Sequence, residues 1–235
     1  MIGRVLAADF LKIRRKMIWG LVFLGPFGVV ALQAVNFGLR YDYLTKQYAS
    51  DLWGGLLENM QFLSVPALLL GITLVTSMIA GVEHQMNAWK QLLALPVSRK
   101  SVFTAKFLLS LLLLLVSCTL LAGGAMILGW GLGFGTDIPY GKLAKLCFSP
   151  LIASLPVLAL QLWLSITMRN QALPLTAGIL GTVLTLFGPV LPDWVIWKWP
   201  LLQGDDAGDY VRLGAGLGVA LLAAGLVDFT RRDVK

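Results

Sequence analysis

The chain has 235 residues, of which 57% are hydrophobic and 13% are charged, and its net charge is +7. A soluble domain carries roughly 25% charged residues, because its surface faces water. With a mean hydropathy of +0.79, the composition predicts an all-α integral membrane protein and leaves no room for a separate nucleotide-binding or catalytic domain of ordinary size.

Residues 1–16 predict an amphipathic helix that lies on the membrane surface. The apolar residues recur at spacings of three or four: Ile2, Leu6, Phe10, Ile13 and Met17. Arg4, Lys12, Arg15 and Lys16 lie mostly outside this stripe, where basic side chains meet anionic headgroups. A simple topological anchor explains the same pattern.

Six apolar stretches follow, and each is long enough to cross the hydrocarbon core as a helix of about 20 residues. They lie near residues 17–37, 59–82, 105–132, 146–168, 172–191 and 211–229. Together they predict one transmembrane domain that occupies residues 1–235. No Asp, Glu, Lys, Arg or His stands at the centre of a predicted span, which argues against an ion-coupled carrier.

The connections between these spans differ in charge. Of the 19 Lys and Arg residues, 13 fall on the side that holds both chain ends, and six fall on the other side. Because basic connections stay in the cytoplasm, we expect both termini to be cytoplasmic. The excess of positive charge then sets the orientation of the protein and is not a nucleic-acid footprint.

The stretch 83–106, EHQMNAWKQLLALPVSRKSVFTAK, connects the second and third predicted spans. Met86, Trp89 and Leu93 share one helical face, and polar residues mostly occupy the other. Pro96 ends this helix, and Ser98 or Ser101 is placed to cap the next one. The pattern predicts a short cytoplasmic helix, which either offers a docking edge to a partner or only fixes the topology.

The stretch 192–204 places Trp194, Trp197 and Trp199 at the outer boundary of the membrane. Tryptophan favours this interface, so anchoring is one interpretation, and an outer gate or a shallow re-entrant hairpin is the other.

Sites for catalysis and metal binding are poorly supported. His84 is the only histidine, and the stretch 135–142, GTDIPYGK, departs from a phosphate-binding loop in spacing and in its following residue. Glu83 beside His84 is the only pair suited to acid–base chemistry at the membrane surface. We therefore predict no catalytic residues, no metal site and no cofactor in this chain.

The stretch from Glu83 to Lys106 resembles the segment between the second and third spans of ABC-2-type transporter permeases. It looks most like the permeases of lantibiotic and bacitracin self-protection transporters. The matching residues are Glu83, Asn87, Trp89, Lys90, Leu92, Leu93, Leu95, Pro96, Val97, Ser98, Arg99 and Lys106.

The resemblance implies that this segment is a coupling helix that docks on a separate ATP-binding subunit through Glu83, Asn87, Trp89, Lys90, Leu93, Pro96 and Arg99. It implies two permease chains, identical or related, around two ATPase subunits that hold ATP and Mg²⁺. It also implies re-entrant structure between the fifth and sixth spans. The expected protein is a multi-pass permease of the bacterial cytoplasmic membrane that exports antimicrobial peptides. Another cargo (lipid, glycan, drug or sodium) and a lipid-modifying membrane enzyme remain alternatives.

Overall fold

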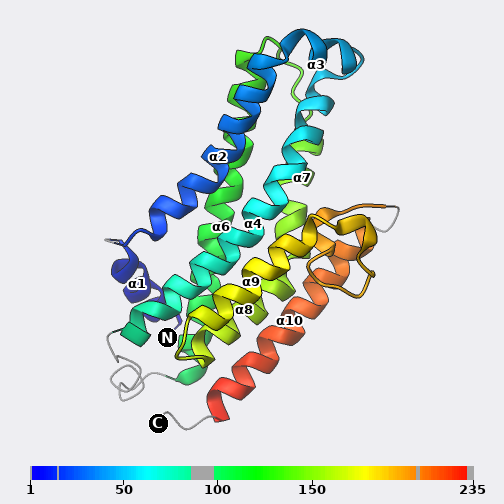
Figure 1. Cartoon of the computed structure of the whole chain (residues 1–235). Coiled ribbons are helices and arrows are strands. Elements are labelled where there is room, and N and C mark those ends of the chain that lie inside the picture. Colours follow the sequence, from blue (N-terminus) through cyan, green and yellow to red (C-terminus); the bar gives the residue numbers. More distant parts are fainter. Residues whose placement is uncertain (1, 15, 86–97, 205–206, 232–235) are drawn as a thin grey trace.

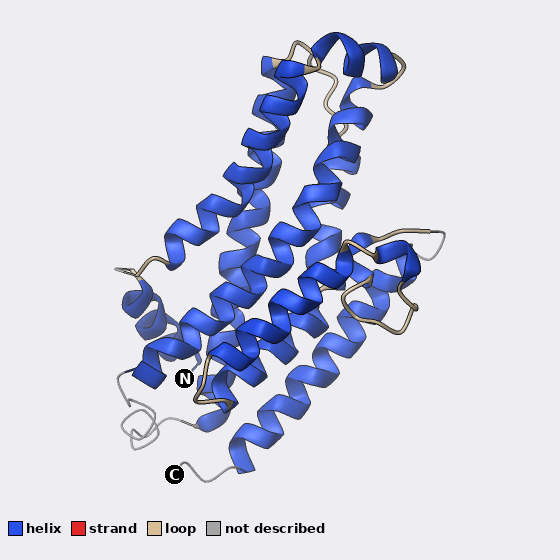
Figure 2. Cartoon of the chain, viewed as in Figure 1, coloured by secondary structure: helices blue, strands red, loops and turns tan. Residues whose placement is uncertain are grey.

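The computed structural model describes residues 2–14, 16–85, 98–204 and 207–231, and Figure 2 shows helices and loops throughout these ranges and no strand. The α-helices are α1 (Ile2–Ile13), α2 (Ile18–Leu39), α3 (Tyr41–Gln47), α4 (Leu52–Gln85), α6 (Arg99–Gly131), α7 (Tyr140–Ala153), α8 (Leu155–Thr167), α9 (Ala172–Thr185) and α10 (Ala207–Arg231). Two 3₁₀ turns, η1 (Gly188–Val190) and η2 (Trp199–Leu201), lie between α9 and α10.

The long helices run side by side in one bundle, and both chain ends lie at the same end of it (Figure 1). We call this the terminal end; α3 lies at the opposite end. Helix α4 is central, since it packs against α2, α6, α7, α8 and α9. Its side chains Leu56, Leu69 and Ile72 are completely buried. A helix that is apolar all round is suited to this position.

Four helices are long and apolar enough to span a membrane: α2, α4, α6 and α10. The predicted fourth span is divided into α7 and α8, which form a bent pair that could serve as a fifth crossing. The predicted span at 172–191 contains the 14-residue helix α9, which is about 21 Å long, whereas the hydrocarbon core is about 30 Å thick. The structure therefore offers four or five crossings by length, and the count of six stays a prediction.

The bend of 44° between α7 and α8 has a cause in the sequence. Ser154 separates the two helices, and Pro156 in the first turn of α8 has no N–H to continue the hydrogen-bond ladder. Glycines of α10 pack directly against this break. A Cβ added to Gly214 would lie 2.6 Å from Ala153 Cα, and one added to Gly218 would lie 2.6 Å from Leu155 Cβ. Gly214 and Gly218, four positions apart, thus let α10 approach the bend closely.

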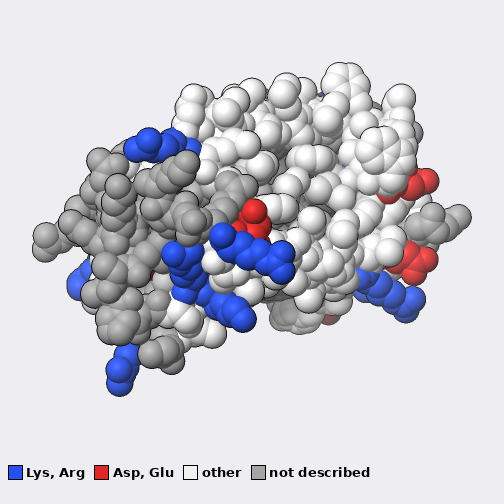
Figure 3. Space-filling view, turned by 90° about the horizontal axis from the view of Figure 1, so that it is seen from below, with Lys and Arg blue, Asp and Glu red and all other residues white. Residues whose placement is uncertain are grey.

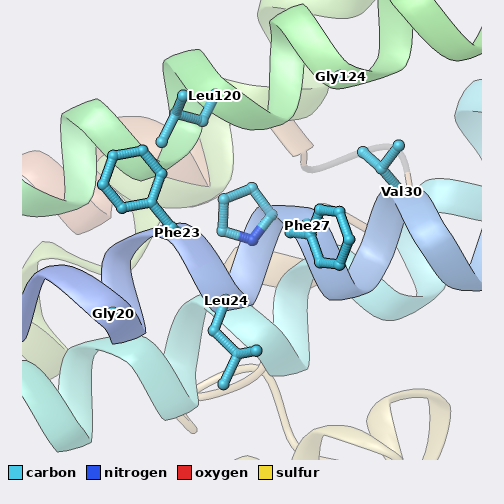
Figure 4. Close-up of a pocket in the computed structure, with 8 residues that line it drawn as sticks. Gly20, Phe23, Leu24, Phe27, Val30, Leu120 and Gly124 are labelled. Carbon is cyan, nitrogen blue, oxygen red and sulfur yellow. The ribbon is translucent and has the colours of Figure 1, made fainter. Parts of the chain in front are cut away.

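Large apolar side chains are exposed along α2 and α9, as expected for surfaces that face lipid: Phe23, Leu24, Phe27, Leu180, Val183 and Leu184. A groove of about 410 Å³ lies between α2 and α6, and side chains including Phe23, Phe27 and Leu120 line it (Figure 4). All its lining residues are apolar or glycine. This groove therefore offers no side-chain hydrogen bond to a polar molecule.

Candidate functional site

Four charged side chains from three helices meet at the terminal end of the bundle. Asp9 and Lys12 come from α1, Glu83 comes from the last turn of α4, and Lys106 comes from the second turn of α6. We call these four residues the ion cluster. Asp9 and Lys12 are three positions apart, so they lie on the same side of α1.

The ion cluster is closed by four contacts. Lys12 Nζ donates to Asp9 Oδ1 at 3.0 Å and to Glu83 Oε1 at 3.1 Å. Lys106 Nζ lies 2.8 Å from Glu83 Oε2 and 3.7 Å from Asp9 Oδ2. The two contacts of Lys106 are ion pairs without hydrogen-bond geometry, since both of these carboxylate oxygens accept no hydrogen bond from the described residues. Each lysine therefore bridges the same two carboxylates.

The ion cluster is deeply buried except at Lys12. The side chains of Lys106, Glu83 and Asp9 are 1%, 2% and 4% exposed, whereas that of Lys12 is 38% exposed. Two positive and two negative charges make the group neutral, which is the condition under which buried charges are tolerated. Removal of one member leaves an uncompensated charge in the interior. The three helices are thus joined by a contact that is costly to open.

The apolar face of α1 supports the same docking. Val5 packs with Val102 and Ala105 of α6, and Ile13 packs in a second cluster with Ile79 and Leu109. Ile2 and Phe10, which belong to the predicted apolar stripe, are each 40% exposed. The helix itself is confirmed, but the side that packs against the protein is centred on Val5, Asp9 and Ile13.

Burial lowers the pKa of the Lys12 ammonium, but the neighbouring Asp9 and Glu83 carboxylates raise it more, so the pKa is above its ordinary value of 10.5. The positive form of Lys12 is therefore favoured in the folded protein. Lys12 therefore stays positively charged at physiological pH, and the four charges of the ion cluster sum to zero.

The predicted coupling segment is described only at its two borders. Asn87, Trp89, Lys90, Leu93 and Pro96 lie outside the described residues. Glu83 belongs to the ion cluster, so its side chain faces α1 and α6 and is hidden from the surface.

Arg99 stands at the start of α6, where its guanidinium donates to the carbonyl of Thr230 in α10 at 3.3 Å. Ser98 caps this helix, as predicted, because its hydroxyl accepts the N–H of Ser101 at 3.1 Å. The start of α6 is thereby joined to the end of α10.

A second polar contact ties α4 to the turn between α8 and α9. The ring nitrogen Nε2 of His84 lies 3.0 Å from the carbonyl oxygen of Ser165. Gln171 donates to the same carbonyl and accepts from the hydroxyl of Ser77 at 3.0 Å. In the contacts described, Glu83 thus binds lysines of α1 and α6, whereas His84 binds α8.

The tryptophans of the stretch 192–204 lie in turns and a 3₁₀ segment, and the described part of this stretch contains no helical hairpin. Trp194 is 79% exposed, whereas Trp199 is 6% exposed and donates to the carbonyl of Asp193 at 2.7 Å. Trp197 packs over Gly181 of α9. Trp199 thus belongs to the protein interior, and a gate role for the three residues stays a prediction.

Basic side chains gather on the terminal end, which Figure 3 shows from below. Besides Lys12 of the ion cluster, the exposed ones among the described residues are Arg4, Arg14, Lys16, Lys100, Arg169 and Arg231. Among the described residues, no group of three or more His, Cys, Asp or Glu side chains is arranged to hold a metal ion. The surface around the ion cluster is therefore positively charged, and the cluster itself is neutral.

Sequence reasoning placed Glu83 and Lys106 in a connection and did not join them to α1. The available signal was Asp9, an acidic residue among apolar positions of an amphipathic helix, with Lys12 one turn further on. A buried carboxylate requires a cation, but the sequence does not say which lysine supplies it.

The model of the family described as "ABC-2 family transporter protein" matches residues 5–188. No curated protein matches the sequence. The family match covers most of the chain, including the ion cluster and the borders of the predicted coupling segment. The chain therefore belongs to the ABC-2 family of transporter proteins, whose members are membrane components of ABC transporters.

Proposed function

We propose that this member of the ABC-2 transporter family is the permease subunit of an exporter that expels antimicrobial peptides of the lantibiotic or bacitracin type. A separate ATP-binding subunit, present in two copies, holds ATP and Mg²⁺ and drives it. A second permease chain, identical or related, completes the assembly. The protein lies in the bacterial cytoplasmic membrane with its terminal end inside the cell, in keeping with the basic residues of that end.

The observation that supports this mechanism is the ion cluster. Helix α4 ends at Gln85 and α6 begins at Arg99, so these two helices are the ones that the predicted coupling segment joins. Lys106 and Glu83 hold their ends together, and Lys12 and Asp9 add α1 to the same unit. A push on the segment would therefore move α1, α4 and α6 together instead of separating them.

In this hypothesis, a movement of α1, α4 and α6 is transmitted to the other helices through the contacts of α4 and α6. Helix α4 packs against α8 and α9, and His84 contacts the last turn of α8 through the Ser165 carbonyl. Arg99 passes the same displacement to the end of α10. In this hypothesis Glu83 is a positioning residue, because it acts through Lys12 and Lys106 and has no exposed surface for the ATPase.

Co-purification with the ATPase subunit tests the docking site. We expect Trp89→Ala and Arg99→Glu to reduce recovery of the ATPase with the tagged permease and to reduce peptide-stimulated ATP hydrolysis. Lys100→Glu is the matched control, since it makes the same charge change at the neighbouring exposed position. Retention of the ATPase and of transport in both test variants would refute the coupling assignment.

Glu83→Gln separates positioning from docking. We expect this variant to keep the ATPase bound but to export less peptide for each ATP hydrolysed, because α1, α4 and α6 are no longer held as one unit. If the variant exports the normal amount of peptide for each ATP hydrolysed, the ion cluster has no role in coupling. The family membership does not depend on this result.

The cargo is tested by growth of a deletion strain against bacitracin, lantibiotics and detergents. The proposal predicts sensitivity to the peptides that the intact gene reverses. An unchanged peptide profile, with a defect in lipid, glycan, drug or sodium handling, would assign the permease to another cargo.

A further inference from the structure

A recess of about 630 Å³ lies near the end of the bundle opposite the termini. Its walls come from the start of α4, from α7 and from the first turns of α10, and Leu202 after η2 closes one side. We propose that this recess binds a phosphoethanolamine group, with the phosphate at Lys145 and the primary ammonium at Glu58. The inference depends on neither the cargo nor the coupling mechanism.

Among the described residues, four charged side chains line the recess, and two of them already pair with each other. Lys142 Nζ donates to Asp51 Oδ2 at 2.6 Å. Lys145, one turn after Lys142 on α7, and Glu58 on α4 are both exposed and have no ion-pair partner among the described residues. Within the described part of the chain, the recess thus presents one cation and one anion without an ion-pair partner, on two different helices. A ligand that satisfies both must itself carry one positive and one negative charge.

The more deeply buried part of the recess lining is apolar. Leu57 and Leu146 are 6% and 8% exposed, and Pro150 and Val211 lie beside them in the lining. Charges at the rim above an apolar floor match a molecule with a zwitterionic head and an apolar body. A phosphatidylethanolamine fits both parts, whereas free phosphoethanolamine uses the rim alone.

The walls are held in place before any ligand binds. Gln61 of α4 donates to the carbonyl of Leu201 at 3.0 Å, which fixes α4 against η2. The Asp51–Lys142 pair joins the start of α4 to α7. The ring of Tyr48 packs on Gly55, where a side chain would collide with it, and the Tyr48 hydroxyl accepts from Asn59 at 3.3 Å. A preformed site binds at a lower entropic cost.

Hydrogen bonding favours a primary ammonium over a quaternary one. An ammonium presents three N–H donors to a carboxylate, and a phosphate accepts the N–H donors of lysine in charge-assisted hydrogen bonds. Phosphocholine has no N–H to offer Glu58, and phosphatidylglycerol has no positive charge. The recess should therefore bind a phosphoethanolamine group more tightly than phosphocholine or phosphatidylglycerol.

The test uses the full purified chain in detergent and measures its affinity for dihexanoyl-phosphatidylethanolamine by calorimetry. Dihexanoyl-phosphatidylcholine and dihexanoyl-phosphatidylglycerol are the comparison lipids, and free phosphoethanolamine separates the two sources of the group. We expect the ethanolamine lipid to bind about tenfold more tightly than either comparison lipid, which corresponds to one charge-assisted hydrogen bond. Stronger binding of the lipid than of free phosphoethanolamine assigns the site to the lipid, and equal binding assigns it to the soluble compound.

Lys145→Ala and Glu58→Gln should each weaken binding of the ethanolamine lipid about tenfold. Lys46→Ala and Asp42→Asn are the matched controls, because both residues are exposed on α3 and do not line the recess. Unchanged thermal unfolding of all four variants verifies that they fold. The proposal is overturned if the choline lipid binds as well as the ethanolamine lipid, or if loss is seen for Glu58→Gln alone, which would indicate a site for simple cations.

Discussion

The two ends of the bundle each bring together two lysines and two carboxylates, and they use them differently. In the ion cluster at the terminal end, each lysine contacts both carboxylates, and three of the four groups are almost fully buried. In the recess at the opposite end, Lys142 and Asp51 form one pair with side chains 63% and 49% exposed, and Lys145 and Glu58 stay apart. All four charges are thus paired at the terminal end, whereas only two of the four described charges are paired in the recess.

Burial explains this difference. Charges in the interior must be paired because water cannot compensate them, so the ion cluster holds three helices in one arrangement. Exposed charges keep their hydration and gain little from pairing, so they remain available to a ligand. Residue type alone would assign the same role to both groups, and their depth in the bundle separates them.

Removal of Lys106 should produce the largest difference between the two ends. Lys106→Met leaves Glu83 and Asp9 buried with only the half-exposed Lys12 beside them, so we expect the free energy of unfolding to fall by about 3–5 kcal/mol. Lys142→Met is the matched change in the recess and should cost less than about 1 kcal/mol. Unfolding of both variants in mixed micelles measures the two losses.

Equal losses of unfolding free energy for Lys106→Met and Lys142→Met would contradict the claim that the buried ion cluster stabilises the protein more than the exposed pair in the recess. The triple variant Asp9→Asn, Glu83→Gln, Lys106→Met provides a further control, because it removes the uncompensated charges as well. It should recover part of the stability that the single variant loses.

Asp9→Asn should loosen α1 while the rest of the bundle stays folded. The variant leaves the ion cluster with one excess positive charge, at a cost of about 1–3 kcal/mol. Val5 is 9% exposed against α6, so a Val5→Cys reporter should react faster with maleimide once α1 detaches. The native Cys118 and Cys147 are both buried and give little background. An unchanged labelling rate would show that the apolar contacts alone dock α1.

The fold was predictable where the sequence carries long apolar runs. The third predicted span, 105–132, coincides with α6 up to its last residue, Gly131, and the sixth, 211–229, lies within α10. The second begins earlier than predicted, because residues 52–58 also belong to α4 although this stretch is less apolar. The division of 146–168 at Ser154 has a local signal in Pro156, whereas the close packing of Gly214 and Gly218 against this break comes from a distant helix, and the local pattern does not contain that contact.

The candidate sites were less predictable, because they are made by contacts between distant segments. Glu83 was singled out from its place in a motif, and its partner Lys12 lies 71 positions earlier in the chain. Glu58 and Lys145 carry no motif, and α4 and α7 bring them to one recess only in the folded bundle. A single sequence indicates which residues carry charge, whereas the helix packing determines which charges meet.

Alkaline pH should weaken the ion cluster through Lys12. Because the folded-state pKa of Lys12 is raised, its contribution is complete below the unfolded value of about 10.5 and is lost as pH rises through the folded pKa. The loss should be less than about 1 kcal/mol, since water screens the exposed part of this side chain. Thermal unfolding against pH measures it, and Lys12→Arg, which stays charged, should flatten the profile. Parallel profiles for both proteins would show that Lys12 is not the titrating group.

The smallest effect is expected at Asp51, and it has the opposite pH dependence. The hydrogen bond from Lys142, with one from the Gly54 N–H, holds the pKa of Asp51 below its ordinary value of 3.8. Its contribution is therefore present above the unfolded pKa and is lost as pH falls through the folded pKa. A double-mutant cycle of Asp51→Asn and Lys142→Met should give a coupling of about 0.5 kcal/mol or less, reduced further by salt, because both side chains are exposed. The same cycle for Glu83→Gln and Lys106→Met should be larger and insensitive to salt. A salt-sensitive coupling at the ion cluster would mean that water reaches it, and the contrast between the two ends would then be one of degree.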